Sequence, residues 1–242
     1  MLTSLIFFAH GFSAVASLAL IIYVVRKDHP TLLSKTAAGL FLCISIWSLG
    51  NLFVQRPSTT EHAAWLWGSI AAVGWSVMTP ILLLFFLLFA GRTDVLRRKS
   101  LYLILFFIPA LVNYQQWNNS FLIFVKESYG WGIHWPATHV ARLFYILELG
   151  VVVACVSVIN SYVKEEKNEM KIRQAKLIVV NTYASFVLIF LNSVVMPVLE
   201  LTFIPVMGDV IAFLWALGLI YGDKKYGLFR EEDILRPSSQ RF

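Results

Sequence analysis

The stretch that decides the fold is PILLLFFLLFAGR, residues 80–92, an apolar run that ends abruptly in a basic segment. It closes a longer apolar segment, residues 64–90, and Arg97, Arg98 and Lys99 follow it closely. A helix needs roughly 20 apolar residues to cross about 30 Å of hydrocarbon. The segment therefore predicts a transmembrane helix with a basic end.

Six further apolar runs resemble this one. We expect seven spans, at residues 2–25, 36–55, 64–90, 100–116, 140–163, 177–201 and 204–221. The fourth is the shortest clean run, and Pro109 interrupts it. Hydrophobic residues make up 58% of the 242 residues and charged residues only 14%, against about 25% in globular proteins. The composition excludes a soluble fold and predicts an all-α, polytopic membrane protein.

The basic residues lie on alternate connections between the runs. All of the 20 Lys and Arg residues fall within residues 26–35, 92–99, 164–176 and 224–241, except Arg56, Lys126 and Arg142. Short loops rich in Lys and Arg stay cytoplasmic, so we expect the N-terminus outside and the C-terminus inside. The net charge of +6 then indicates attraction to anionic lipid headgroups and not nucleic-acid binding.

The fourth connection, residues 117–139, is the only sizeable outer loop. Two apolar and aromatic runs, residues 121–125 and 131–135, flank Tyr129-Gly130. Such runs around a Gly-containing turn are typical of a β-hairpin, and an irregular interfacial loop is the alternative.

Two polar segments lie at the inner side. Residues 164–176 suit either a helical extension of spans five and six or a solvated charged loop. Residues 223–242 form a short polar tail, and Pro237 is a breaker within it. We therefore divide the chain into a membrane domain, residues 1–222, and a tail or linker, residues 223–242.

Three acids lie in or at the edge of the apolar runs: Glu148, Glu200 and Asp209. An ionisable residue within a membrane is costly and marks a candidate functional site. The expected topology puts all three in the outer half, which favours an outward-opening pocket between spans five, six and seven. The alternative is that Glu200 and Asp209 meet interfacial water and that Glu148 bonds to a neighbouring helix.

Aromatic and amide side chains could complete this pocket. The candidates are Trp65, Trp75, Tyr145 and Asn192. Tryptophans gather on the outer side, which fits an aromatic ligand site, although an aromatic belt would also explain them. For Asn192 the simpler alternative is a hydrogen bond between helices.

Several chemistries lack the residues that they need. No span contains Lys, which excludes a retinal Schiff base, and we expect His10 near the outer end of its span with the other histidines in loops. Cys43 and Cys155 both fall inside spans, where a disulfide framework is not expected. The sequence contains no GxxxxGK[ST], HExxH or CxxC motif. We expect no enzyme activity, cofactor or metal.

Four places in the sequence resemble the seven-helix N-terminal sensor region of bacterial and archaeal membrane histidine kinases. They are the run closing on Gly91-Arg92, the Tyr129-Gly130-Trp131 turn, the Arg173-x-Gln entry to span six, and the seventh span, which opens on Met207-Gly208-Asp209 and exits through residues 221–229. The resemblance covers essentially the whole chain.

The resemblance implies a signalling module in a bacterial or archaeal cytoplasmic membrane. Its outer half would recognise a small ligand or lipid, and Tyr221, Tyr226 and Phe229 would carry the signal to a cytoplasmic kinase or similar module. The module could belong to a longer protein or act alone, as a homodimer or with a partner. A small-solute or proton-coupled transporter and a non-catalytic anchoring subunit are the alternatives.

Overall fold

The computed structural model describes residues 2–26, 31–118, 121–135, 138–199, 201 and 205–229. The described chain is predominantly helical. Its elements are α1 (Leu2–Val25), α2 (Leu32–Val54), α3 (Glu61–Phe89), α4 (Thr93–Leu96), α5 (Lys99–Trp117), β1 (Ile123–Glu127), β2 (Gly130–His134), α6 (His139–Glu165), α7 (Glu169–Phe190), the π-helix η1 (Leu191–Val195), α8 (Met196–Val198) and α9 (Gly208–Tyr226).

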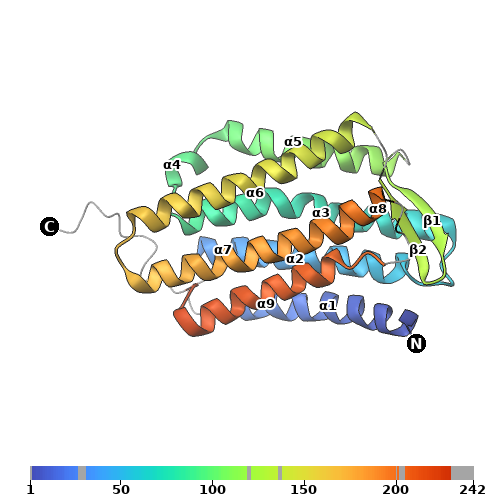
Figure 1. The fold of residues 1–242 in the computed structure, drawn as a ribbon, viewed down its shortest axis with the longest axis horizontal. Helices are drawn as coiled ribbons and strands as arrows, with labels where there is room; N and C mark the ends of the chain where they lie inside the picture. The colour runs from blue at the N-terminus through green and yellow to red at the C-terminus, as the bar shows by residue number, and fades with distance from the viewer. Residues whose placement is uncertain are drawn as a thin grey trace.

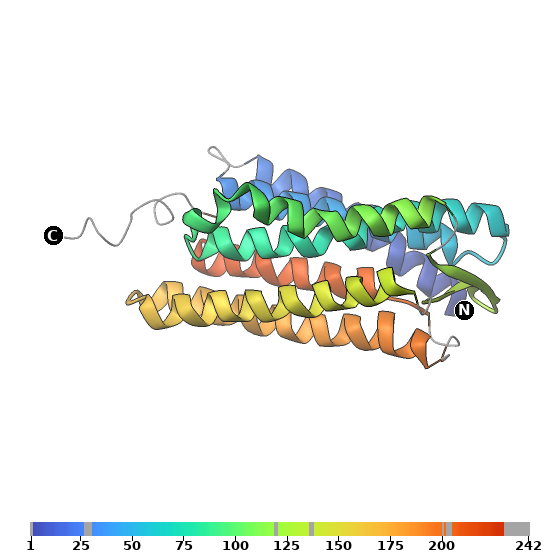
Figure 2. The ribbon, with the colours of Figure 1, turned by 90° about the horizontal axis from the view of Figure 1, so that it is seen from above.

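The long helices run along one common axis and form an elongated bundle (Figures 1 and 2). The N-terminus and the two strands lie at one end, which we call the hairpin end. The connections at residues 90–98, 166–168 and 227–229 lie at the other, which we call the basic end. Antiparallel helices therefore bring the basic connections together, as their alternation in the sequence requires.

Polar caps set where several helices begin. Thr31, Thr60 and Thr138 each accept a hydrogen bond from the backbone amide three residues later, and Asn168 accepts from Met170 and Lys171. Such caps satisfy amides that the first turn leaves free. The helices consequently start before their apolar runs, and α7 begins at Glu169 instead of residue 177. Residues 169–176 are thus helical.

The helix that contains α7 continues through η1 and α8. The Met196 amide donates to Leu191 O, five residues back, which is the π-helical pattern. Pro197 follows, and it has no amide to donate to Ser193 O. The helix ends at Val198 and not at residue 201, and α9 begins at Gly208 and not at residue 204.

Two packing units are joined through α2 and α3. These two helices approach closely because Gly50 lies against Ala71, and Gly74 against the backbone of Trp47. On one side α3 packs with α5 and α6; on the other, α1, α2 and α7 pack with α9. Contacts between α6 and α7 are sparse, so these helices form the seam between the units.

Five helices are long and apolar enough to cross a membrane. They cover Thr3–Val25, Leu32–Val54, Glu61–Phe89, His139–Glu165 and Glu169–Val198. The helices α5 and α9 correspond to the remaining two expected spans, but each has only 19 residues. Asp209, Asp223, Lys224 and Lys225 also make the ends of α9 polar. The structure is therefore that of a multi-pass membrane protein, with five spans supported by length and composition.

The segment for which the sequence allowed a hairpin or an irregular loop contains two antiparallel strands. They pair from Ile123 opposite His134 to Glu127 opposite Gly130. Gly130 has a φ of 144° and lies against the backbone of Gln55, so a side chain there would clash. The hairpin thereby covers the end of α2.

Candidate functional site

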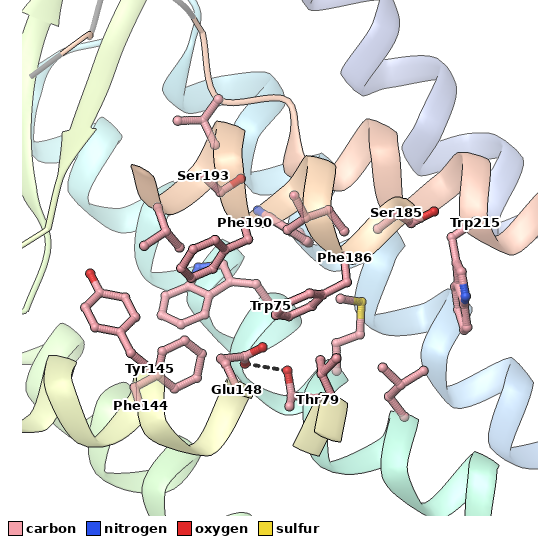
Figure 3. A pocket seen from close by; sticks show the side chains of 18 of the residues that line it. Trp75, Thr79, Phe144, Tyr145, Glu148, Ser185, Phe186, Phe190, Ser193 and Trp215 are labelled. Atoms are coloured by element: carbon pink, nitrogen blue, oxygen red, sulfur yellow. Dashed lines mark hydrogen bonds between the residues drawn. The ribbon is translucent and has the colours of Figure 1, made fainter. Parts of the chain in front are cut away.

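A cavity of about 120 Å³ lies between α3, α6, α7 and α9, next to the hairpin. Figure 3 shows how side chains from these helices surround it. Most of the lining is apolar or aromatic. The lining residues include Trp75, Met78, Thr79 and Leu82 of α3, Phe144, Tyr145, Glu148 and Val152 of α6, Thr182, Ser185, Phe186, Ile189 and Phe190 of α7, and Ala212 and Trp215 of α9.

One acid faces this apolar space. Glu148 accepts a short hydrogen bond from the Thr79 hydroxyl across the contact between α6 and α3 (Figure 3). Among the described residues that line the cavity, Glu148 is the only Asp, Glu, Lys, Arg or His. An acid in such surroundings is costly unless it is paired and hydrogen-bonded, so Glu148 is the chemically distinctive group of the site.

Aromatic rings form the wall toward the hairpin. The Trp75 ring lies 5.4 Å from that of Trp135 and 5.1 Å from that of Phe144, between centroids. The Tyr145 ring lies 5.5 Å from Trp135. These edge-to-face and tilted arrangements are the ones that aromatic pairs prefer. The wall joins α3, the end of the hairpin and α6.

The hairpin is fastened to the π-helical segment at this wall. The indole N–H of Trp135 donates to Ser193 O over 2.7 Å. This carbonyl is one that a helix would normally pair with residue 197, but Pro197 cannot donate. The proline thus makes a backbone acceptor available to the side chain that follows β2.

Two hydroxyl groups at the cavity have no protein partner within the described part of the chain. They are Tyr145 Oη and Ser193 Oγ, and both are buried. Buried polar atoms normally find a partner, so an unpaired one needs an explanation. Both belong to residues nearer the hairpin end than Glu148.

A hydrogen bond also joins the cavity lining to α9. The Trp215 indole donates to Thr182 Oγ1 over 2.9 Å, and Asn181 Nδ2 donates to the Trp215 carbonyl over 2.8 Å. Trp215 and Thr182 both line the cavity. The wall contributed by α7 is therefore bonded to the last long helix.

Asp209 lies in a different, fully packed environment. It is 0% exposed, and its carboxylate lies 2.8 Å from His10 Nδ1 and accepts from Asn51 Nδ2 over 2.8 Å. Ser13 and Ser48 share a hydrogen bond next to it. This network ties α9 to α1 and α2. His10 is itself fully buried within this network.

The other predicted site residues separate from the cavity. Asn192 bonds to Pro205 O and to the Met207 amide, at the start of α9. Trp65 lies against the rings of His62 and Trp117. Glu200 lies outside the described residues. The structure thus brings Trp75, Tyr145 and Glu148 together, so that α3, which carries Trp75, forms a wall beside α6, α7 and α9, and Asp209 is not part of that lining.

The three predicted output residues lie at the basic end. Tyr221 is exposed, the Tyr226 carbonyl accepts from Gln174 of α7 over 2.6 Å, and Phe229 is buried. The Phe229 amide donates to Asp223, whose other oxygen accepts from the Tyr23 hydroxyl over 2.9 Å. The exit from α9 is therefore tied to both α7 and α1.

The turn between α6 and α7 is organised by Glu166. Burial opposes ionisation of its carboxyl, but hydrogen bonds from the Asn168 amide, the Tyr162 hydroxyl and the Lys167 amide outweigh this and lower its pKa. An ionised Glu166 thus stabilises the turn at neutral pH.

Sequence reasoning missed Thr79, Trp135, His10 and Asn51. A signal existed for the last two, because His10, Ser13 and Ser17 share one face of α1, and Ser48, Asn51 and Gln55 one face of α2. Polar stripes within apolar helices point to contacts between helices. Thr79 and Trp135 gain their meaning only from partners distant in sequence. Among the described residues, no three His, Cys, Asp or Glu side chains gather as a metal site.

The bundle, its membrane-length helices and the cavity between them define a multi-pass membrane module with a pocket. A family profile described as the N-terminal 7TM region of histidine kinase matches residues 10–223. The match covers most of the chain, and the chain belongs to this family. The family makes it a membrane sensor module of the histidine-kinase type, a non-catalytic input region. No curated protein compared with the chain matches it significantly.

Proposed function

We propose that this module recognises a small apolar or amphipathic ligand in the cavity beside Glu148 and passes the binding event through α9 to a cytoplasmic kinase-like module. Trp75, Tyr145 and Glu148 would contact the ligand. One observation carries the proposal: the only acid lining the cavity among the described residues shares the cavity with an aromatic wall and with Thr182 of α7, which is hydrogen-bonded to Trp215 of α9. Asp209 and Asn192 would instead hold α9 in place.

The orientation follows from the basic residues. If the basic end faces the cytoplasm, the N-terminus and the hairpin face outward, in a bacterial or archaeal cytoplasmic membrane. The cavity then occupies the outer half, and α9 leads inward. Residues 1–222 would form the sensor, and residues 223–242 would lead to the output module.

Sparse packing between α6 and α7 supports both entry and response. A ligand from the outer leaflet or the outer water layer could reach the cavity along this seam. A ligand shifts a conformational equilibrium only by its difference in affinity for the two states. Because α6 and α7 belong to different packing units, a ligand that touches both would favour one separation of the units over another.

The response would leave through the contacts at the basic end. Displacement of α7 would act on α9 at Trp215 near the cavity and at Tyr226 through Gln174. The links from Asp223 to Tyr23 and Phe229 would then change as well. In this proposal Tyr221, Tyr226 and Phe229 mark the segment whose position the kinase-like module reads.

Covalent filling of the cavity tests the proposal without knowledge of the ligand. Cys43 and Cys155 are replaced with Ala, Ser193→Cys is introduced, and the thiol is alkylated with a small maleimide in lipid nanodiscs. Hydrogen exchange of residues 221–229 is followed by mass spectrometry. We expect alkylation to change the exchange of these amides.

Ser4→Cys is the matched control, since Ser4 is exposed on α1 and does not line the cavity. Its alkylation should leave residues 221–229 unchanged. Quantitative alkylation of Ser193→Cys with no change in exchange at residues 221–229 would contradict the relay.

A further inference from the structure

We propose that the ligand class of this cavity is a small organic cation, an alkylammonium whose charge pairs with Glu148 and whose carbon groups pack on the aromatic wall. The inference rests on the proposed function and deepens it, because it names the chemistry that the same cavity selects.

The charge balance of the cavity favours a cation. Glu148 accepts a hydrogen bond from Thr79, and no Lys, Arg or His lies among the described lining residues. A carboxylate accepts at several positions and one hydroxyl satisfies only one of them. A ligand ammonium would supply the opposite charge. If it carries N–H groups it would also donate to the remaining acceptor positions of Glu148, and if it is quaternary its methyl groups would contact the carboxylate.

The helical spacing places aromatic rings one turn from the polar pair. Phe144 and Tyr145 precede Glu148 by four and three residues on α6, and Trp75 precedes Thr79 by four residues on α3. Residues at these spacings share a helix face. Figure 3 shows Trp75, Phe144 and Tyr145 near Glu148. Electron-rich ring faces attract cations, and quaternary ammonium groups are bound by such aromatic surroundings.

A second anchor lies toward the hairpin end. Tyr145 Oη and Ser193 Oγ are buried at the cavity without protein partners among the described residues. A ligand with a hydroxyl or an ester oxygen a few bonds from its ammonium would satisfy them. The three features together describe a short, polar-tailed alkylammonium, and a purely hydrocarbon ligand would leave both hydroxyls unpaired.

A free cation and a lipid headgroup share this chemistry. Choline is a soluble example, and the same trimethylammonium group ends the headgroup of phosphatidylcholine. Nanodiscs of phosphatidylglycerol contain no ammonium, so they leave the cavity free for a soluble probe. Nanodiscs that contain phosphatidylcholine offer the headgroup as a competitor.

The test titrates choline and its neutral carbon isostere, 3,3-dimethylbutan-1-ol, into the full chain in phosphatidylglycerol nanodiscs. Tryptophan fluorescence reports binding, since Trp75 and Trp135 line the cavity. We expect saturable quenching by choline and none by the isostere. Glu148→Gln should weaken choline binding by about tenfold or more, the lower end of the coupling between close opposite charges. Glu61→Gln, an exposed acid on α3, should leave it unchanged.

The outcomes distinguish a free cation, a lipid headgroup and a neutral ligand. Weaker apparent binding of choline in phosphatidylcholine nanodiscs assigns the site to a lipid headgroup, and equal binding in both lipids assigns it to a free cation. Equal binding of choline and its isostere overturns the cation but leaves a ligand cavity. If protein that unfolds cooperatively shows no saturable choline binding, the cation proposal is also overturned. The alkylation of Ser193→Cys then tests separately whether the cavity is coupled to residues 221–229.

Discussion

Glu148 on α6 and Asp209 on α9 lie in opposite kinds of environment. Asp209 is fully buried and receives contacts from His10 and Asn51, on two other helices. Glu148 has one donor among the described residues, Thr79, and faces a cavity. An acid in an apolar helix can therefore be interpreted only through its partners. A satisfied acid holds helices together, whereas an acid beside space can meet a ligand.

The packing around the two acids differs in the same way. Asp209 lies where α9 meets α1 and α2, and the network joins these three helices. Glu148 lies on α6, which contacts α7 only sparsely. A ligand that contacts both α6 and α7 would therefore act at the seam between the two packing units.

The largest expected effect is the loss of Asp209. Asp209→Ala should destabilise the fold by about 3–5 kcal/mol, since removal of one partner leaves the rest of a buried pair uncompensated. Thermal unfolding in nanodiscs measures it. Asp94→Ala, on the exposed surface at the basic end, is the control and should change little. Equal stability of Asp209→Ala and the unmodified chain would contradict a structural role for this network.

Thr79→Val should have the next largest effect. The substitution keeps the shape and removes the hydroxyl that donates to Glu148. We expect a loss of about 1–3 kcal/mol, the range for leaving a buried polar group without its partner. Thr36→Val is the control, since Thr36 is partly exposed and its hydroxyl donates to Leu32 O within its own helix. A loss in Thr79→Val no larger than in Thr36→Val would show that the contact contributes nothing.

A smaller effect is expected for the fastening of the hairpin. Trp135→Phe keeps an aromatic ring but removes the N–H that donates to Ser193 O. The unfolding free energy should fall by about 0.5–1.5 kcal/mol, and hydrogen exchange should rise in residues 123–134. Trp117→Phe, at a 45% exposed position, serves as the comparison. Unchanged exchange in the hairpin of Trp135→Phe would contradict the fastening.

The smallest effect on stability is expected at Glu148 itself. Glu148→Gln retains the acceptor for Thr79 and removes only the charge, so stability should change by no more than about 0.5–1 kcal/mol. The free energies of unfolding of Glu148→Gln and Asp209→Ala are measured in the same nanodiscs and compared. A loss at Glu148→Gln as large as that at Asp209→Ala would place both acids in the structural class and end the distinction.

Much of the helical framework was predictable from hydropathy, whereas the helix ends were not. Apolar runs locate the spans, but Thr31 and Asn168 begin helices within polar sequence because their side chains cap free amides. Glu148 could be singled out because an acid stands alone in an apolar run. Thr79 and Trp135 could not, since their roles depend on residues more than 50 positions away in sequence.

The sequence also grouped residues that the fold separates. Asp209 and Glu148 both lie in apolar sequence, and only the three-dimensional packing shows that Asp209 contacts His10 whereas Glu148 lines a cavity. Asn192 looked like a pocket residue because it is polar. It instead bonds to Pro205 O and the Met207 amide, where the chain enters α9.

The most direct test of this division is the reactivity of two matched thiols. Ser193→Cys lines the cavity and Ser48→Cys lies in the Asp209 network, and both serines are buried. In a chain with Cys43 and Cys155 replaced by Ala, a small thiol reagent in nanodiscs should modify Ser193→Cys readily and Ser48→Cys only upon unfolding. Equal reaction rates at the two positions, or a reactive Ser48→Cys beside an inert Ser193→Cys, would contradict an accessible ligand cavity beside a closed structural network.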